Sequence, residues 1–339
     1  MTSDLRRLHL LDLLKVMTLL AIQILHVWEF IFYEDDLILP GSILYQPLLQ
    51  YYARVFSIGG QVLVAVIYLL FGLTEKTKTS LLKIAGFAVL GQIALAFAFM
   101  EDGKPNFEWD IYSFIFLTNL LLLFLPRGKI SLVIVSFILL WVSPSVWKGF
   151  IPENLLTDLL VGRKGDFSTG AWAPMPWFFH ALLFFNLGTL TRRKVIALSE
   201  WNRAETFMWP MLFAFSIPFL GFYFSTPIGP NYYFFNFHQT MPVYWANFLP
   251  FVFWIRLAFL EKLRAKLESK WLLRWVSSLQ WSRQLGLCYV TAVLYLGLSA
   301  QYEEFFRSSP LAFDALALSV MPVSEIIVRI LMKIVPKKK

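Results

Sequence analysis

The stretch LDLLKVMTLLAIQILH, from Leu11 to His26, has the length and apolar content of a membrane-spanning helix, yet it contains an acid, a base, an amide and an imidazole: Asp12, Lys15, Gln23 and His26. A charged side chain costs roughly 2.5–3.5 kcal/mol at the centre of a bilayer, so such residues point to a function. At about 100° per residue, Lys15, Gln23 and His26 all lie within about 60° of Asp12 around the helix. We expect these four residues, the polar stripe, to face the interior of a helix bundle.

The composition of the whole chain predicts a membrane protein. Of its 339 residues, 58% are hydrophobic and only 15% are charged, whereas about 45–50% of a soluble domain is apolar. The mean hydropathy is +0.62. Apolar runs near 20 residues recur along the chain without a Ser/Gly/Pro-rich linker between them. We therefore predict an all-α polytopic fold, a bundle of about ten helices that forms a single integral membrane domain over residues 1–339.

Ten segments are predicted to span the membrane: 8–32, 53–73, 81–100, 111–125, 130–147, 175–191, 207–225, 242–260, 284–300 and 310–334. The first carries charged residues and no small-residue cleavage signal follows it, so we interpret it as a retained helix rather than a signal peptide.

The basic residues behind the net charge of +8 are concentrated in alternate loops between the predicted spans. The 33–52 and 226–241 loops contain no lysine or arginine, whereas 191–206 holds four and 261–283 holds six, ten of the thirty in the chain. This alternation obeys the positive-inside rule and predicts that both termini are cytoplasmic, as in a bacterial inner-membrane protein. The charge is thus a topology signal that can also attract anionic lipid or a phosphorylated donor, and we expect no nucleic-acid partner.

The 261–283 segment is predicted to form an amphipathic helix at the cytoplasmic interface. Its apolar residues recur at four-residue spacing: Leu263, Leu267, Trp271, Trp275 and Leu279. Two roles remain open for it, a connection between the eighth and ninth spans or a contact with a donor.

Common catalytic motifs of soluble enzymes are absent from the sequence. Cys288 is the single cysteine, and the four histidines are scattered, so we predict neither a disulfide nor a metal site. Glu325 and Arg329 are expected to pair at i,i+4 spacing, and Asp314 to reach water near the outer start of its span. For His26 a structural hydrogen bond and a functional role remain equally open.

The order of residues from Arg7 to His26, RLHLLDLLKVMTLLAIQILH, resembles the first helix of the transmembrane acyltransferase superfamily. This group includes the family-3 acyltransferases and bacterial proteins that resemble heparan-α-glucosaminide N-acetyltransferase. The family pattern is R…(I/L)D-x-L-R-G-(x)n-H. The spacing from Lys15 to His26 reproduces its R-x10-H, with lysine in place of arginine and Val16 in place of glycine.

Two later segments are similar to the family in the same order. YYARVFSIGGQVLVAVIYLLFGL, residues 51–73, has an arginine, Arg54, and a late glycine. APMPWFFHALLFFNLG, residues 173–188, is similar to the P-x-P-W-(F/L)-G…LG signature. LRWVSSLQWSRQLGLCYVTAVLY, residues 273–295, occupies the place of a G-x-x-S…Y-x-x-H pattern but lacks its final histidine. The resemblance implies a divergent member, or one that has lost activity.

The resemblance implies acyl transfer, usually of acetyl, from cytoplasmic acyl-CoA to an envelope sugar or glycolipid on the other face. The donor is a substrate, and no tightly bound cofactor is expected. His26 would accept the proton of the acceptor or carry the acyl group, Lys15 would meet donor phosphates, and Asp12 would hold Lys15.

We also expect residues that bind substrate. Arg54 would polarise a carbonyl or bind an acidic acceptor. The other expected substrate-binding residues are Gln23, Glu29, Trp177 and His180. For His180 and Trp177 the alternative is a packed aromatic helix that contains a hydrogen-bonded histidine.

A reading from a different functional class also remains open, in which the same bundle is a transporter or a scaffold without catalysis. Acyl transfer predicts a path between the two membrane faces through His26. The second reading predicts a packed polar stripe, or a cavity that alternates and binds solute.

Overall fold

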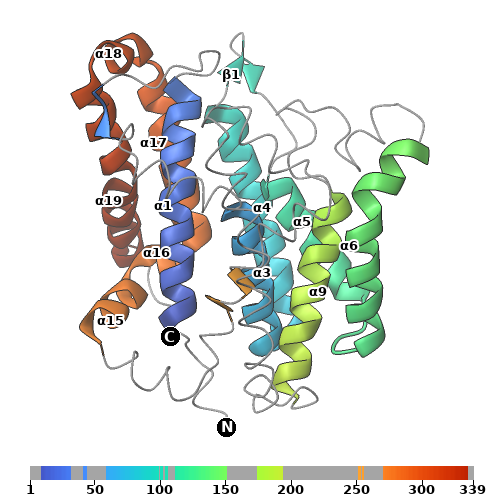
Figure 1. Cartoon of the computed structure of the whole chain (residues 1–339). Coiled ribbons are helices and arrows are strands. Elements are labelled where there is room, and N and C mark those ends of the chain that lie inside the picture. Colours follow the sequence, from blue (N-terminus) through green and yellow to red (C-terminus); the bar gives the residue numbers. More distant parts are fainter. Residues whose placement is uncertain are drawn as a thin grey trace.

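The computed structural model describes residues 9–31, 41–43, 59–98, 100–101, 104–105, 111–150, 174–193, 251–252, 254–255 and 270–334 (Figure 1). Within these residues the fold is helical apart from two short antiparallel strands, β1 (Met100–Glu101) and β2 (Lys104–Pro105). The helices are α1 (His9–Ile31), α3 (Gly59–Leu73), α4 (Lys78–Ala98), α5 (Ile111–Phe124), α6 (Ile130–Phe150), α9 (Pro174–Arg192), α15 (Trp271–Ser278), α16 (Gln280–Arg283), α17 (Leu285–Ala300), α18 (Glu303–Ser308) and α19 (Pro310–Ile334).

The long helices coincide with predicted spans. Helices α1, α3, α4, α5, α6, α9, α17 and α19 fall on eight of the ten apolar segments, with ends that differ by a few residues. The segment 207–225 and most of 242–260 lie outside the described residues. The number of ten helices therefore stays a prediction, whereas the helical fold class is confirmed.

Two of the described helices are long and apolar enough to cross a membrane by length and composition, Lys78–Phe97 and Pro310–Ile334. Shorter apolar helices cover 60–73, 111–124, 130–140 and 285–300. Large apolar side chains on several helices point away from the bundle, among them Phe97 on α4, Phe124 on α5 and Leu318 on α19. Extensive apolar exposure of this kind marks a surface that contacts lipid or another protein.

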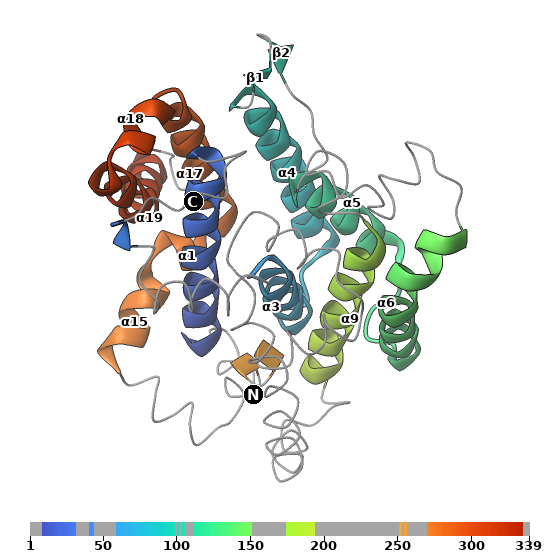
Figure 2. The same cartoon turned by 45° about the horizontal axis from the view of Figure 1, so that its top comes forward.

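Helix α1 stands between two groups of helices (Figure 2). On one side α1 packs against the C-terminal helices α15, α16, α17 and α19. On the other side it packs against α3, which in turn makes the most extensive helix contact of the described fold, with α9. Helices α4 and α17 also touch, so they join the two groups a second time.

The contact of α3 with α9 depends on two glycines. A Cβ atom on Gly72 would lie 2.1 Å from the backbone oxygen of Phe185, and one on Gly188 would lie 2.3 Å from the backbone oxygen of Leu69. Small residues let membrane helices approach each other this closely. Gly72, the glycine near the end of the 51–73 segment, thus sets the distance between the backbones of α3 and α9.

The loops predicted to share the basic face lie together at one end of the bundle. Arg193 after α9 pairs with Glu75 (Nε–Oε1 3.2 Å) and donates to the backbone oxygen of Arg127 at 3.1 Å. Arg127 in turn donates to the backbone oxygen of Lys76 at 2.6 Å. These contacts join the α3–α4 and α5–α6 turns to the end of α9.

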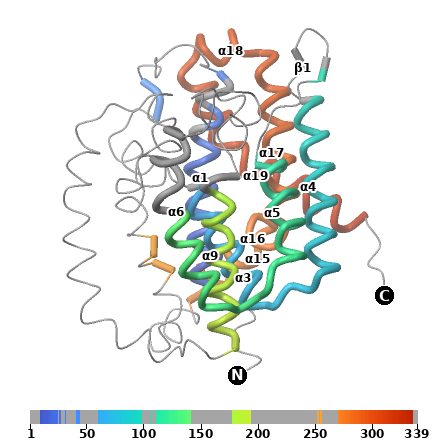
Figure 3. The backbone as a smooth tube through the Cα atoms, turned by 90° about the vertical axis from the view of Figure 1, so that its right-hand side faces the viewer, coloured from blue at the N-terminus to red at the C-terminus, as the bar shows by residue number. Residues whose placement is uncertain are grey.

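The residues that follow α1 and precede α19 are predicted to lie on the membrane face opposite the basic loops. They meet at the end of the bundle where α18 and the strands lie (Figure 3). Arg307 of α18 donates to the backbone oxygen of Ile31 at the end of α1, with a distance of 2.6 Å. Asp314 at the start of α19 accepts bonds from the Ser42 hydroxyl and the Ile43 backbone nitrogen. Asp314 thus binds protein groups at the end of the bundle, where water was expected to reach it.

Candidate functional site

Asp12 and Lys15 form a buried ion pair near the start of α1. The Lys15 Nζ lies 2.6 Å from Asp12 Oδ1, and each residue is only 6% exposed. Lys15 also donates to the backbone oxygen of Ser282 in α16, at 3.0 Å. The expected contact of Asp12 with Lys15 is confirmed, and the bond to Ser282 joins α1 to the C-terminal helices. A buried cation keeps its charge only when partners of this kind replace its water.

Further contacts hold the first turns of α1 at the same end. The His9 ring nitrogen Nδ1 bonds the Ser277 hydroxyl of α15. On another side, Trp254 donates its indole N–H to the backbone oxygen of Leu10 at 3.3 Å. Helix α1 is therefore fixed against two segments distant in sequence, which sets the direction of the polar stripe.

His26 lies 11 residues beyond Lys15, about 16 Å along the helix axis. Its Nε2 is 2.9 Å from the phenolic oxygen of Tyr289 on α17, and the two rings meet edge to face. The Tyr289 ring lies 6.0 Å from that of Tyr112 on α5. Tyr112 donates its hydroxyl proton to the backbone oxygen of Gly286 at 3.1 Å. The imidazole is half-buried where α1 meets α17, and Tyr289 links it to Tyr112 of α5.

Gln23 lies between the ion pair and His26 along the stripe. Its side chain is completely buried. Within the described part of the chain, neither its amide oxygen nor its amide nitrogen has a hydrogen-bond partner. The stripe thus contains a satisfied ion pair, an unpaired amide and a histidine bonded to a tyrosine, in that order from the basic end.

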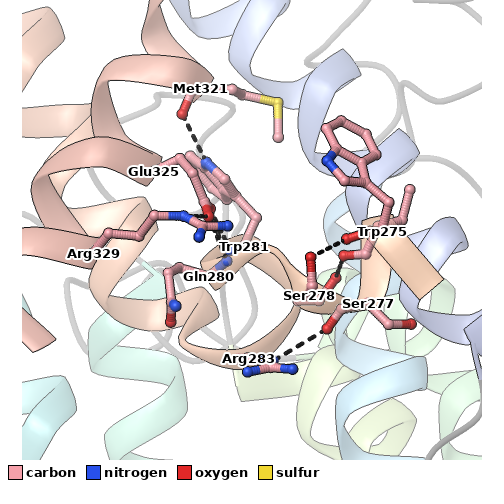
Figure 4. Close-up of polar contacts among 11 residues, drawn as sticks. Trp275, Ser277, Ser278, Gln280, Trp281, Arg283, Met321, Glu325 and Arg329 are labelled. Atoms are coloured by element: carbon pink, nitrogen blue, oxygen red, sulfur yellow. Dashed lines mark hydrogen bonds and ion pairs between the residues drawn. The ribbon is translucent and has the colours of Figure 1, made fainter. Parts of the chain in front are cut away.

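The short helix α16, which carries Ser282, is positioned by α19 (Figure 4). The Glu325 carboxylate accepts the backbone N–H of Gln280, at 2.7 and 2.9 Å to its two oxygens, and that of Trp281 at 3.2 Å. Arg329 donates to the same carboxylate at 2.6 Å, so the predicted i,i+4 pair is confirmed. The Trp281 indole N–H bonds the backbone oxygen of Met321 at 3.0 Å.

Because of this anchor, the predicted amphipathic helix over 261–283 is not continuous. It is interrupted at Leu279, whose extended backbone (φ −64°, ψ 147°) separates α15 from α16. The reason is that the Glu325 carboxylate receives the N–H groups that a continuous helix would use internally. In α15, Trp271 and Trp275 are exposed, whereas Leu273 and Val276 pack inward. Residues 261–269 lie outside the described residues.

His180 and Trp177, the expected substrate-binding residues of α9, lie in the helix-packed core. Both are buried, at 0% and 2% exposure. The His180 Nε2 is 3.0 Å from the backbone oxygen of Gln61 on α3, and its ring packs edge to face on Trp177 and Phe184. These contacts match the packed, hydrogen-bonded histidine that was the alternative reading.

The contacts of two other expected site residues lie outside the described part of the structure. Arg54 lies outside the described residues, as does the side chain of Glu29, although Glu29 itself belongs to α1. Among the described side chains, no three His, Cys, Asp or Glu residues are grouped so that they could hold a metal ion.

Sequence reasoning missed the partners of the stripe on the C-terminal helices. Ser282 and Tyr289, which bond Lys15 and His26, both belong to the stretch compared above with the family's G-x-x-S…Y-x-x-H pattern. That comparison was the one available signal. It concerned a missing histidine, not the tyrosine that bonds His26.

Comparison of the chain with known protein families, curated proteins and solved structures found no match.

Proposed function

We propose that this protein is a membrane-bound acyltransferase that moves an acyl group, most simply acetyl, from acyl-CoA to a sugar or glycolipid of the cell envelope. The observation that carries the proposal is the half-buried imidazole of His26, held at 2.9 Å by the Tyr289 hydroxyl. The residue order around it, which resembles the first helix of transmembrane acyltransferases, gives the reaction class.

In the proposed reaction, His26 acts on the acceptor hydroxyl or amine. The imidazole takes the acceptor's proton as the acceptor oxygen or nitrogen attacks the thioester carbon. The new C–O or C–N bond forms, the C–S bond breaks, and the proton passes from the imidazole to the leaving thiolate. Tyr289 orients the ring, because a hydrogen bond at Nε2 fixes which ring nitrogen carries the proton.

The contacts of Lys15 suit a structural role better than a contact with donor phosphates. Asp12 and the Ser282 backbone oxygen already occupy its ammonium group. We propose that the pair fixes α1 against α16 and thereby sets the position of His26 further along the helix. Lys15 then acts on the reaction through the geometry of the bundle.

The membrane setting belongs to the same proposal. The exposed apolar side chains of α4, α5 and α19 would face lipid, and the end with Lys76, Arg127 and Arg193 would face the cytoplasm, since basic loops stay on that side. Acyl-CoA would approach from that end, and the acceptor from the end near α18. His26 lies in the half of α1 nearer the acceptor side.

A second candidate is a transporter or scaffold without catalysis. The observation in its favour is the Asp12–Lys15 ion pair at the basic end of the stripe. Because Asp12 already binds the Lys15 ammonium group, that end of the stripe is packed and offers no charged group to an acyl-CoA donor. In this case the His26–Tyr289 bond would only orient α1 against α17, as interhelical bonds do in other membrane bundles.

One experiment separates the two candidates. Purified protein in detergent or nanodiscs is incubated with radiolabelled acetyl-CoA and envelope extract, and the extract is searched for a labelled sugar or lipid. A heat-denatured sample is the control for chemical acetylation. Label that appears only with native protein supports acyl transfer; its absence, from protein that remains folded, supports the second candidate.

A further inference from the structure

Gln23 differs from Asn119 and Asn186, two other buried carboxamides of the described helices, because both of its polar atoms lack a partner. The Asn119 nitrogen donates to the Tyr68 hydroxyl at 3.1 Å and to the Ile115 backbone oxygen at 2.7 Å, and only its oxygen has no partner among the described residues. Asn186 accepts the backbone N–H of Gly128 and donates to Leu182. In the described part of the chain, both polar atoms of Gln23 lack a partner, although the residue is 0% exposed.

An unpaired amide is costly in this position. Water can offer little compensation within an apolar bundle, and an apolar group of the same shape in its place can be nearly neutral or stabilising. A buried glutamine that has no partner among the described residues therefore points to a partner that binds from outside. The cost is recovered when that partner arrives.

The place of Gln23 connects it to the proposed reaction. It precedes His26 by three residues, which is one helical turn and about 4.5 Å along the axis. Residues at this spacing lie on the same helix face. A substrate that bonds the Gln23 amide through one group would therefore have its neighbouring reactive atom close to the His26 imidazole.

The chemistry of a carboxamide limits what it can bind. It is neutral and offers one acceptor and two donor hydrogens side by side. An anion would satisfy the N–H groups and leave the oxygen unpaired, whereas an amide or a hydroxyl can satisfy both atoms.

We propose that Gln23 is a substrate-recognition residue that bonds a neutral donor-and-acceptor group, an amide or a hydroxyl, one turn from His26. The inference rests on the proposed acyl transfer. Two sources share this chemistry: the amides of the pantetheine arm of the donor, and the hydroxyl or acetamido groups of a sugar acceptor.

The test uses Gln23→Met, which keeps the side-chain volume and removes both polar atoms. The matched control is Gln92→Met on α4, because Gln92 accepts a bond from the Ser113 hydroxyl at 3.0 Å. Without ligand, Gln23→Met should melt at the same temperature as the wild type or higher, and Gln92→Met should melt lower. If Gln23→Met melts as low as the control, the amide has a partner within the protein and the inference is wrong.

Ligand binding then identifies the source. If Gln23 bonds the pantetheine arm, Gln23→Met should weaken CoA binding about tenfold and leave binding of 3′,5′-ADP, which has no such arm, unchanged. If it bonds the acceptor, CoA binding should be unchanged and KM for the labelled acceptor should rise about tenfold.

The two hypotheses fail in different ways. An active wild type whose CoA affinity and acceptor KM are both unaffected by Gln23→Met overturns the role of Gln23 alone. A folded wild type that neither binds CoA nor transfers acetyl overturns the proposed function, and the role of Gln23 with it.

Discussion

The imidazole of His26 and the hydroxyl of Tyr289 meet at 2.9 Å although the two residues are 263 positions apart in the chain. This bond joins the first helix to α17, and it is the polar contact closest to the proposed chemistry. If Tyr289 orients the imidazole, removal of the Tyr289 hydroxyl should lower the rate of acyl transfer more than it lowers the stability of the protein.

Tyr289→Phe should therefore lower kcat of acyl transfer by about 2- to 12-fold, the effect of one hydrogen bond of about 0.5–1.5 kcal/mol. The control is Tyr295→Phe on the same helix, which loses a comparable bond to Ser319 at 2.9 Å. Equal kinetic effects in the two variants would contradict a positioning role for Tyr289.

The Asp12–Lys15 pair should behave as a unit in stability measurements. Asp12→Asn alone leaves a buried ammonium group without its counter-charge, so it should cost about 3–5 kcal/mol of unfolding free energy. The double variant Asp12→Asn, Lys15→Met should recover much of this loss. Chemical denaturation in detergent measures both.

The exposed pair of Glu75 with Arg193 serves as the control, since Glu75→Gln should cost about 1 kcal/mol or less. The same variants test the donor-contact alternative. Should Lys15→Met weaken CoA binding strongly while the protein stays folded, Lys15 meets the donor and the structural role proposed for it is wrong.

The glycine contact between α3 and α9 predicts a strong steric effect. Gly72→Ala and Gly188→Ala should each destabilise the protein by about 1–3 kcal/mol, because the added methyl meets backbone atoms that cannot move aside. Gly86→Ala on α4 is the matched control, since a Cβ there has no neighbour within 4 Å. It should be neutral or stabilise the helix by up to about 1 kcal/mol. Melting temperatures that fall equally in all three variants would contradict this account of the interface.

Orientation can be tested with single cysteines, because the native Cys288 is buried and should not react. Lys270→Cys, at the end with α15, should be labelled by an impermeant maleimide only after the cells are opened. Phe305→Cys, 61% exposed before mutation and at the opposite end, should be labelled in intact cells. The reverse pattern would contradict the cytoplasmic assignment of the basic end.

Much of the fold could be predicted because its signals are local. Apolar runs placed eight helices, and the spacing on α1 placed Asp12, Lys15, Gln23 and His26 on one stripe. The i,i+3 and i,i+4 ion pairs were predictable for the same reason, since one helix fixes both partners.

The unpredicted features all depend on contacts between distant segments. The break at Leu279 arises because Glu325, 45 residues away from Gln280, accepts N–H groups at the start of α16. Tyr289 as the partner of His26 is another such contact. Helical spacing gives the direction of a side chain but not the helix that it meets.

The most direct test of the central claim is acyl transfer by the His26→Gln variant. Glutamine has a similar size and keeps hydrogen bonding to Tyr289, but it cannot take up the acceptor's proton. A general base contributes about 10²–10⁴-fold, whereas a hydrogen bond between membrane helices averages only about 0.6 kcal/mol. We predict that transfer from radiolabelled acetyl-CoA falls at least about a hundredfold with little change in melting temperature. Transfer that survives in this variant while the melting temperature falls would show that His26 is a structural residue, and would contradict the account.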